Sequence, residues 1–348
     1  MFEIWFGIVA VMFTAYVVLD GYDLGAGALH LFVARTGDER RQVLAAVGPF
    51  WDANEVWLLA AGGALFVGFP RVLAVGLSGF YLAIFLVIWT LVVRAVAIEF
   101  RSHVGDALWR AFWDVMFTMA SALLAILWGA AIGNVIRGLP LGANGWFALA
   151  LFTDFSAKPP VGILDWYTVL TGVFALVALV GHGSVFLAWR TDGPVHDRAR
   201  KVAGRAFVVL AVSWPLVSWA THVVNPTLLP ALAGRPLAWL GLLLAIAGLV
   251  SVFAGLARGR PLTAFLGSSA WLAGMLVATA ACLYPVMLRA VPDAAYSITV
   301  NDSGNTAGGL HTALGWWAVG FPIAIVYFAI LFRLHRGKAV AAAEGKGY

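Results

Sequence analysis

Nine charged side chains of this sequence lie within long apolar runs or at their ends. A charge at membrane depth costs roughly 3 kcal/mol on insertion scales, so such residues usually face a protein interior or a water path. Carboxylates and arginines grouped in this way can move protons or ions, or they can serve a redox centre. The sequence therefore predicts more than a simple membrane anchor. The nine residues are Asp20, Asp23, Asp52, Glu55, Arg94, Glu99, Arg101, Arg110 and Asp114.

The composition excludes a soluble globular protein. Of the 348 residues, 62% are hydrophobic and only 11% are charged, whereas roughly 25% are charged in soluble domains. The net charge of +5 does not indicate nucleic-acid binding, because the basic residues lie in short loops between apolar runs, where they act as topology signals. Cys282 is the only cysteine, which rules out an intramolecular disulfide.

Apolar runs of about 18 residues or more predict nine membrane-spanning helices. The first residues lack the basic region of a cleaved signal peptide, so we expect the first run to be retained as a span. The predicted spans cover residues 4–33, 50–69, 72–95, 109–134, 163–189, 203–224, 237–257, 262–288 and 310–333.

The distribution of arginine and lysine predicts the orientation of these spans. The segments that follow the first, third, fifth, seventh and ninth spans contain 17 of the 22 basic residues. The amino terminus is therefore expected outside and the carboxyl terminus in the cytoplasm. In this orientation the nine charged residues gather at the cytoplasmic ends of the first four spans.

A short internal sequence repeat predicts how the spans are grouped. Residues 31–36 (LFVART) resemble residues 186–191 (FLAWRT), four spans later in the chain. An offset of four spans keeps the direction of the helices, which is typical of repeated bundles. We therefore expect an all-α integral membrane protein with a single polytopic domain over 1–348. It contains one four-helix bundle in 1–135, a second in 160–290, and a peripheral ninth helix in 308–334.

The histidines do not form an obvious heme or metal site. His182 and His222 lie within the fifth and sixth predicted spans and are the candidate pair, but they lie near opposite ends of their helices, whereas axial ligands must lie at matched depths. We interpret both as hydrogen-bonded structural groups, and we place His30 near the cytoplasmic interface. No metal site is expected, and no nucleophile or phosphate-binding motif indicates a catalytic residue.

The carboxylates have a structural interpretation that explains only some of them. Acids in the first turn of a helix complement its dipole, which applies to Asp52, Glu55 and Asp114. It does not apply to Asp20 and Asp23, which lie in the last part of an inward-running helix, where the dipole disfavours anions. These two acids need a cationic partner, and the arginines at the end of the third span can supply it.

Several motifs together resemble subunit II of the cytochrome bd-type quinol oxidases. They are LDGYDLG at 19–25, PFWDANEVW at 49–57 followed by AGGALF at 61–66, SGFY at 78–81, and FRS at 100–102 with Trp109-Arg110 and Trp113-Asp114. The order and spacing match the family pattern over roughly residues 16–135, and a looser match surrounds 301–306.

The resemblance implies a nine-helix subunit of a quinol oxidase in the bacterial cytoplasmic membrane. Its partner, subunit I, holds the b hemes, heme d and the quinol site, and the complex reduces dioxygen to water with protons from the cytoplasm. Some members of the family hold a structural quinone in subunit II, and the resemblance leaves open a small single-span subunit and contacts with membrane lipid.

The resemblance also assigns roles to individual residues. Asp52 and Glu99 match the acids of the proton path, where the family often has Asp at the second position. Asp23, Arg94 and Asp114 match positions that support the hemes at the subunit boundary. Secondary candidates are Asp20, Glu55 and Arg101.

A proton-coupled secondary transporter is the alternative function. It would also have acids within the membrane and a repeated architecture. Such transporters place their binding site near the bilayer midplane, between interrupted helices. The acids of this sequence are instead expected near one face, which favours the oxidase subunit.

The orientation leads to a first testable prediction. Reporter fusions should place residue 1 outside the cytoplasm and the segment after Arg333 inside it. A cytoplasmic reporter signal at the amino terminus, or an external one after Arg333, would contradict the nine-span topology.

Overall fold

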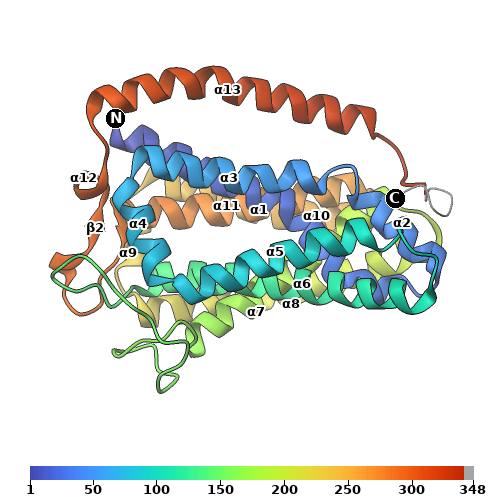
Figure 1. Cartoon of the computed structure of the whole chain (residues 1–348), viewed down its shortest axis with the longest axis horizontal. Coiled ribbons are helices and arrows are strands. Elements are labelled where there is room, and N and C mark those ends of the chain that lie inside the picture. The colour runs from blue at the N-terminus through green and yellow to red at the C-terminus, as the bar shows by residue number, and fades with distance from the viewer. Residues whose placement is uncertain (341–348) are drawn as a thin grey trace.

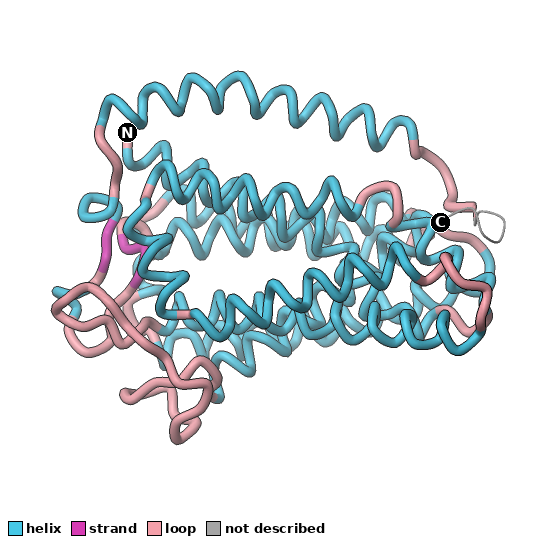
Figure 2. The backbone as a smooth tube through the Cα atoms, in the orientation of Figure 1, coloured by secondary structure: helices cyan, strands magenta, loops and turns pink. Residues whose placement is uncertain are grey.

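The computed structural model describes residues 1–340, and this part of the chain is mostly helical (Figures 1 and 2). Eight of its helices are long and apolar enough to cross a membrane. They lie side by side along the long axis of the molecule (Figure 1). These helices are α1 (Phe2–Val33), α5 (Tyr81–Phe100), α6 (Ala107–Arg137), α7 (Trp166–Arg190), α8 (Gly193–Val224), α10 (Pro236–Ala257), α11 (Pro261–Leu283) and α13 (Ala307–Leu334).

A ninth candidate span is broken. Helix α3 (Trp51–Gly68) is followed at once by α4 (Pro70–Gly79), and the two form an angle of 120°. Proline disfavours helical geometry in the residue before it, and Phe69 accordingly has a φ of −140° and a ψ of 64°. Helix α3 runs along the bundle, whereas α4 turns across one end of it (Figure 1).

The end of α4 at Gly79 corrects the predicted third span. Residues 72–79 belong to α4, and the spanning helix is α5, which runs from Tyr81 to Phe100 rather than over 72–95. The predicted second span ends at this break, but hydropathy did not reveal the junction at Phe80 between α4 and α5, because the apolar composition continues through it. As a result Glu99 lies in the last turn of a helix, not beyond its end.

Two other predicted boundaries are wrong. Helix α8 begins ten residues before the predicted 203, because its charged first turns are helical although they are not apolar. Helix α11 ends at Leu283, and the strand β1 (Val286–Leu288) pairs antiparallel with β2 (Ile298–Thr299) where the prediction continued the helix. The remaining short elements are α2 (Gly37–Val47), α9 (Leu228–Ala231), the 3-10 helices η1 (Leu232–Gly234) and η2 (Ala294–Tyr296), and α12 (Val300–Ser303).

The bundle has two chemically different ends. We call the end that holds α2 the charged end; there α1, α5 and α7 finish and α3, α6 and α8 begin (Figure 1). The opposite, far end holds the 138–165 loop and the two short strands. The amino terminus and the end of α13 lie at opposite ends, and α13 runs along one side with only Leu310 buried.

Helix α1 packs against α3, α6, α7 and α11, so it contacts helices of both predicted bundles. Its contact with α7 depends on two glycines. A Cβ atom added to Gly25 would lie 1.8 Å from the Leu179 carbonyl oxygen, and one added to Gly183 would lie 2.3 Å from the amide nitrogen of Ala26. Glycine lets the two backbones approach this closely, as in membrane helix pairs generally.

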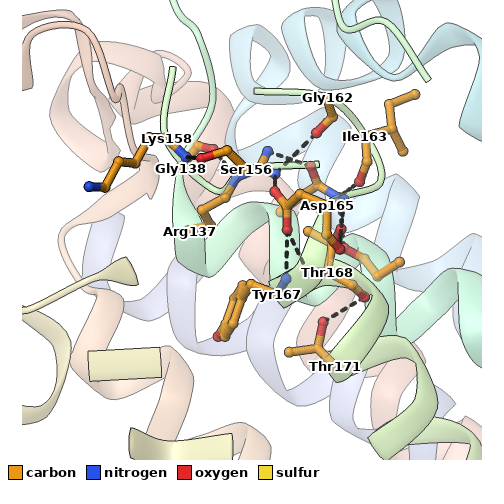
Figure 3. Close-up of polar contacts among 12 residues, drawn as sticks. Arg137, Gly138, Ser156, Lys158, Gly162, Ile163, Asp165, Tyr167, Thr168 and Thr171 are labelled. Carbon is orange, nitrogen blue, oxygen red and sulfur yellow. Dashed lines mark hydrogen bonds and ion pairs between the residues drawn. The ribbon is translucent and has the colours of Figure 1, made fainter. Parts of the chain in front are cut away.

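At the far end a buried ion pair joins the end of α6 to the start of α7 (Figure 3). The Arg137 guanidinium contacts the Asp165 carboxylate and donates to the Gly162 carbonyl at 3.0 Å and to the Asn134 side chain at 2.7 Å. Asp165 also accepts the first free amides of α7, as a helix cap does. The 138–165 loop is thus fixed at both of its ends.

The glycine contact between α1 and α7 leads to the second prediction. Gly25→Ala should lower the melting temperature of the detergent-solubilised protein, because forcing a methyl group into a filled backbone contact costs about 3 kcal/mol or more. Gly7 is the matched control on the same helix, since an added Cβ there meets nothing within 4 Å. Equal melting temperatures for the two alanine variants would contradict the close packing.

Candidate functional site

The first buried cluster lies toward the charged end of the bundle and is centred on Arg94 of α5. Its Nη2 atom lies 2.7 Å from an Asp20 carboxylate oxygen and also forms an ion pair with Glu55. The side chains of Arg94 and Asp20 are completely buried, and Glu55 is partly exposed. A charge in an apolar interior must be paired to be tolerated, so Arg94 holds α1, α3 and α5 together. The predicted need of Asp20 for an arginine is met by this residue.

Asp23 is bonded by a residue that the sequence analysis did not single out. The Asn54 Nδ2 atom lies 2.7 Å from an Asp23 oxygen, 2.7 Å from the Tyr22 hydroxyl and 3.2 Å from the Leu19 carbonyl. Asn54 follows Asp52 by two positions, which is about 200° around a helix, so it faces the interior while Asp52 faces outward. Helical periodicity applied to the WDAN motif would have identified it.

The cluster combines three carboxyl groups with one guanidinium. One oxygen of Asp23, the Nε and Nη1 atoms of Arg94 and the Asn54 carbonyl oxygen are buried without a hydrogen-bond partner in the described part of the chain. Polar atoms of this kind are rare in protein interiors and usually have a functional reason. Chemically, the arrangement can take up and release protons while its net charge stays small.

A second buried cluster surrounds Asp114 of α6. Its carboxylate lies 2.6 Å from His30 Nε2, 2.5 Å from Arg101 Nε and 3.1 Å from Arg40 Nη1. His30 is fully buried, so its prediction as an interfacial residue is wrong. These contacts attach α2 and the segment after α5 to the end of α1 and the start of α6. Asp114 therefore lies inside the charged end of this chain.

Helix α2 is also held from its other side. Its capping box joins Thr36 and Glu39, and Glu39 accepts from Arg198 of α8 at 2.6 Å. Partial burial raises the pKa of Glu39, but the backbone amides of Arg35 and Thr36 and the Arg198 guanidinium outweigh that effect and lower it overall. Glu39 therefore stays charged at neutral pH and fixes α2 to α8.

Asp52 and Glu99 line one hollow at the charged end, which we call the entrance hollow. It has a volume of about 480 Å³ and opens between the start of α3, the end of α5 and α13. Both acids are exposed. Glu55 lies one turn further along α3 and reaches Arg94, so acidic groups continue from the hollow to the buried cluster. The full lining is Gly48, Pro49, Trp51, Asp52, Ala53, Glu99 and Tyr327.

His182 has the environment of a structural histidine. Its Nδ1 atom lies 2.6 Å from the Ser268 hydroxyl and its Nε2 atom 2.9 Å from the Val18 carbonyl oxygen, and its ring stacks on Phe265. Both ring nitrogens are therefore used by protein partners, whereas His222 is exposed. The His182 geometry supports its interpretation as a hydrogen-bonded structural group, and the interpretation of His222 stays a prediction.

A separate apolar cavity of about 530 Å³ lies among α1, α6, α7, α8, α10 and α11. Its few polar groups include the hydroxyls of Tyr167 and Thr221, which are 2.8 Å apart. A cavity of this size and character suits an apolar ligand with a small polar group. Its aromatic lining includes Tyr16, Trp128, Tyr167, Phe174, Trp214 and Trp271.

Fold and site together define a class of protein: a multi-pass helical membrane protein whose buried ionic clusters lie toward one end of the bundle. A model of the family cytochrome bd terminal oxidase subunit II matches residues 1–335. The chain belongs to this family. It is therefore a subunit of a cytochrome bd-type oxidase, which is an oxidoreductase complex of the respiratory chain.

Curated relatives agree with this assignment. The chain is 31% identical to the cytochrome bd-I ubiquinol oxidase subunit 2 of Escherichia coli K12, covering 94% of this chain and 92% of that protein. It is 29% identical to a probable cytochrome oxidase subunit 2 of Haemophilus influenzae over 93% and 91% of the two chains. It is also 35% identical to the Bacillus subtilis cytochrome bd ubiquinol oxidase subunit 2 over 61% and 60%.

The fold matches a solved structure as well. A chain of the bd oxidase from Geobacillus thermodenitrificans superposes with a TM-score of 0.76, covering 96% of this chain and 98% of that one, at 16% sequence identity. At this identity the match concerns the fold alone.

The Asp114 cluster leads to the third prediction. Asp114→Asn keeps the shape but leaves the Arg101 and Arg40 guanidinium groups without their anion, and breaking a buried pair costs about 3–5 kcal/mol. We expect a lower melting temperature and less assembled protein in the membrane. Asp106→Asn is the control on the same helix, because asparagine caps a helix as well as aspartate does and Asp106 is exposed. Equal stability of the two variants would contradict the role of the cluster.

Proposed function

We propose that this chain is the non-heme-ligating subunit II of a bd-type terminal oxidase in a bacterial cytoplasmic membrane. Its partner is a heme-bearing subunit I, and the complex oxidises quinol and reduces dioxygen to water. The b and d hemes of the partner supply the electron transfer to dioxygen. The observation that carries the proposal is that Asp52 and Glu99 line one hollow, from which Glu55 leads to the buried Arg94 cluster.

In this proposal the chain contributes a proton path. Asp52 and Glu99 collect protons from the cytoplasm, because two exposed carboxylates at one opening attract cations and bind protons reversibly. Glu55 is the next carboxyl group inward, one turn of α3 away from Asp52. Arg94, Asp20 and Asp23 then form the buried part, and we assign to Asp23 and Arg94, with Asp114, the support of the heme side of the complex.

The proposed path requires the charged end to face the cytoplasm. The excess of basic residues in the segments at this end supports that orientation, with the amino terminus outside. We also retain the division into two four-helix bundles plus α13 as part of the proposal. The support for it is that α13 lies apart from the other helices, with Leu310 as its only buried residue.

Exposed apolar side chains support a place for subunit I and for lipid. On α3, α5 and α13 large apolar residues such as Leu59, Trp89 and Ile323 are more than half exposed. These are the helices that border the entrance hollow, so a partner seated on them would also cover the proton path. The apolar cavity among α6 to α11 suits a structural quinone. The proposal also allows a small single-span subunit as a further partner.

The transporter alternative is less well supported by the geometry. Transporter sites lie near the midplane at the point where helices are interrupted. Within residues 1–340 the one bent pair of apolar helices, α3 and α4, breaks near the far end, whereas the acids of the two clusters lie toward the charged end. The broken helix and the acids therefore do not form one site.

The proton path leads to the fourth prediction. Asp52→Asn should slow dioxygen reduction by about tenfold or more, because it removes a titrating group while it preserves the shape, and the hemes should be retained. Asp38→Asn is the control, since Asp38 is an exposed acid at the same end. By contrast, Asp23→Asn or Arg94→Ala should lower the heme content of the complex. Wild-type turnover of Asp52→Asn across pH would make Asp52 a residue that only complements the helix dipole.

The fifth prediction concerns the isolated chain. Expressed without its partner, it should show no heme absorption and no oxidase activity, because both nitrogens of His182 are already hydrogen-bonded. The measurement is an optical spectrum with a pyridine hemochrome assay. Stoichiometric heme in the folded chain that is lost in His182→Ala would overturn the prediction.

A further inference from the structure

Arg190, the last residue of α7, is a buried arginine with unusual partners. Its side chain is 4% exposed, and no carboxylate lies within ion-pair distance of it in residues 1–340. Its guanidinium instead lies over the rings of Phe50 and Trp189, with centroid distances of 5.5 and 5.6 Å, and donates to the Gly337 carbonyl. Aromatic faces and a helix carboxyl end both stabilise a cation.

The Gly337 contact belongs to a segment that crosses back to the bundle after α13. We call residues 335–340 the strap. Its Ala339 amide donates to the Arg190 carbonyl at 2.6 Å, and Lys338 Nζ donates to the Thr191 carbonyl at 2.9 Å. Gly337 has a φ of +103°, a conformation that glycine adopts without strain and that directs this short segment onto the end of α7. Figure 1 shows the chain turning back from the end of α13 toward α2.

Phe50 connects the strap to the entrance hollow. Its ring stacks on Phe332 of α13 at 4.8 Å and contacts the His335 ring at 5.8 Å, in addition to its contact with Arg190. Phe50 directly precedes Trp51 and Asp52, which line the hollow. One cation and one ring thus join the ends of α7 and α13 to the start of α3.

Along the bundle α13 is held by Trp57 of α3, whose ring lies 6.1 Å from that of Phe321 and 5.5 Å from that of Phe328 between centroids. Leu310, its one buried residue, lies in its first turn at the far end. Tyr327, which lines the entrance hollow, lies five residues before Phe332, about 7.5 Å along the helix. Trp57 therefore holds α13 at Phe328, next to Tyr327, and the contacts of Arg190 and Phe50 hold its last turn and the strap beyond that point.

We propose that Arg190 is a positioning residue that holds the strap, and through it the α13 wall, beside Asp52 and Glu99, and so sets the shape of the proton entrance. The inference rests on the proposed function only for its effect on proton uptake. The mechanical part, that Arg190 and the strap fix α13 over the hollow, stands on the contacts alone.

The test uses the complete two-subunit oxidase and a cysteine reporter. Cys282→Ser removes the only native cysteine, and Tyr327→Cys then reports the accessibility of the hollow to a water-soluble maleimide. Arg190→Gln, and separately a chain that ends at His335, should label at least threefold faster than the parent. Arg336→Gln is the matched control, because Arg336 is an exposed strap arginine. Unchanged labelling in both Arg190→Gln and the shortened chain would overturn the proposal. If Arg190→Gln does not assemble, the labelling rate of the shortened chain alone decides the outcome.

Turnover is measured in the same variants with Tyr327 and Cys282 intact. Heme content should stay at the parent level in these variants. In Arg190→Gln the alkaline limb of the pH–rate profile should shift to lower pH by at least half a unit, whereas Arg336→Gln should keep the parent profile. Arg190→Lys should reverse part of the shift. Asp52→Asn is measured in parallel. If Asp52→Asn turns over normally, the proposed proton path fails while the labelling result still decides the role of the strap. If Asp52→Asn is slow, but the faster-labelling Arg190→Gln keeps the parent pH profile, the positioning role is wrong.

Discussion

The rest of the structure depends on one constraint: charged groups among apolar helices must find partners within the protein. Arg94 has no low-cost alternative to its contacts with Asp20 and Glu55, and Asp114 is held in the same way by His30, Arg101 and Arg40. Because each cluster draws its members from three or more segments, the pairing fixes how α1, α2, α3, α5 and α6 meet. Ionic pairs in such surroundings are weak sources of net stability but strong determinants of arrangement.

Glycine contacts supply the second determinant, since hydrophobic burial alone does not select one helix neighbour over another in a membrane. Gly25 and Gly183 bring α1 and α7 into backbone contact, and glycines of α10 and α11 do the same for that pair; a Cβ on Gly248, for example, would lie 2.4 Å from the Trp271 amide. These contacts leave no room for a larger side chain at those positions. The Arg94 and Asp114 clusters lie toward the charged end, where the helices carry these acids and arginines.

The two ends of the helix bundle therefore have different roles. At the far end a buried pair, Arg137 and Asp165, closes the 138–165 loop onto α6 and α7. At the charged end the entrance hollow stays open and continues through Glu55 to a buried cluster that is rich in carboxyl groups. In the proposed function, a subunit that ligates no heme serves the oxidase in this way, because proton delivery needs only titratable groups in sequence and a partner that consumes the protons.

The sequence by itself determined the class of the protein, eight or nine apolar helices, and the identity of most ionic residues, because hydropathy and the cost of buried charge are properties of composition and spacing. It also predicted that Asp20 needs an arginine. Only the tertiary structure decided which arginine, since Arg94 and Arg101 lie seven residues apart and select different acids, Asp20 and Asp114. It alone revealed His30 and Arg40 as partners of Asp114 and the junction at Phe80 between α4 and α5, whereas helical periodicity could have pointed to Asn54. Partner choice, chain direction and the role of Arg190 depend on contacts between segments far apart in the chain, and no local pattern encodes such contacts.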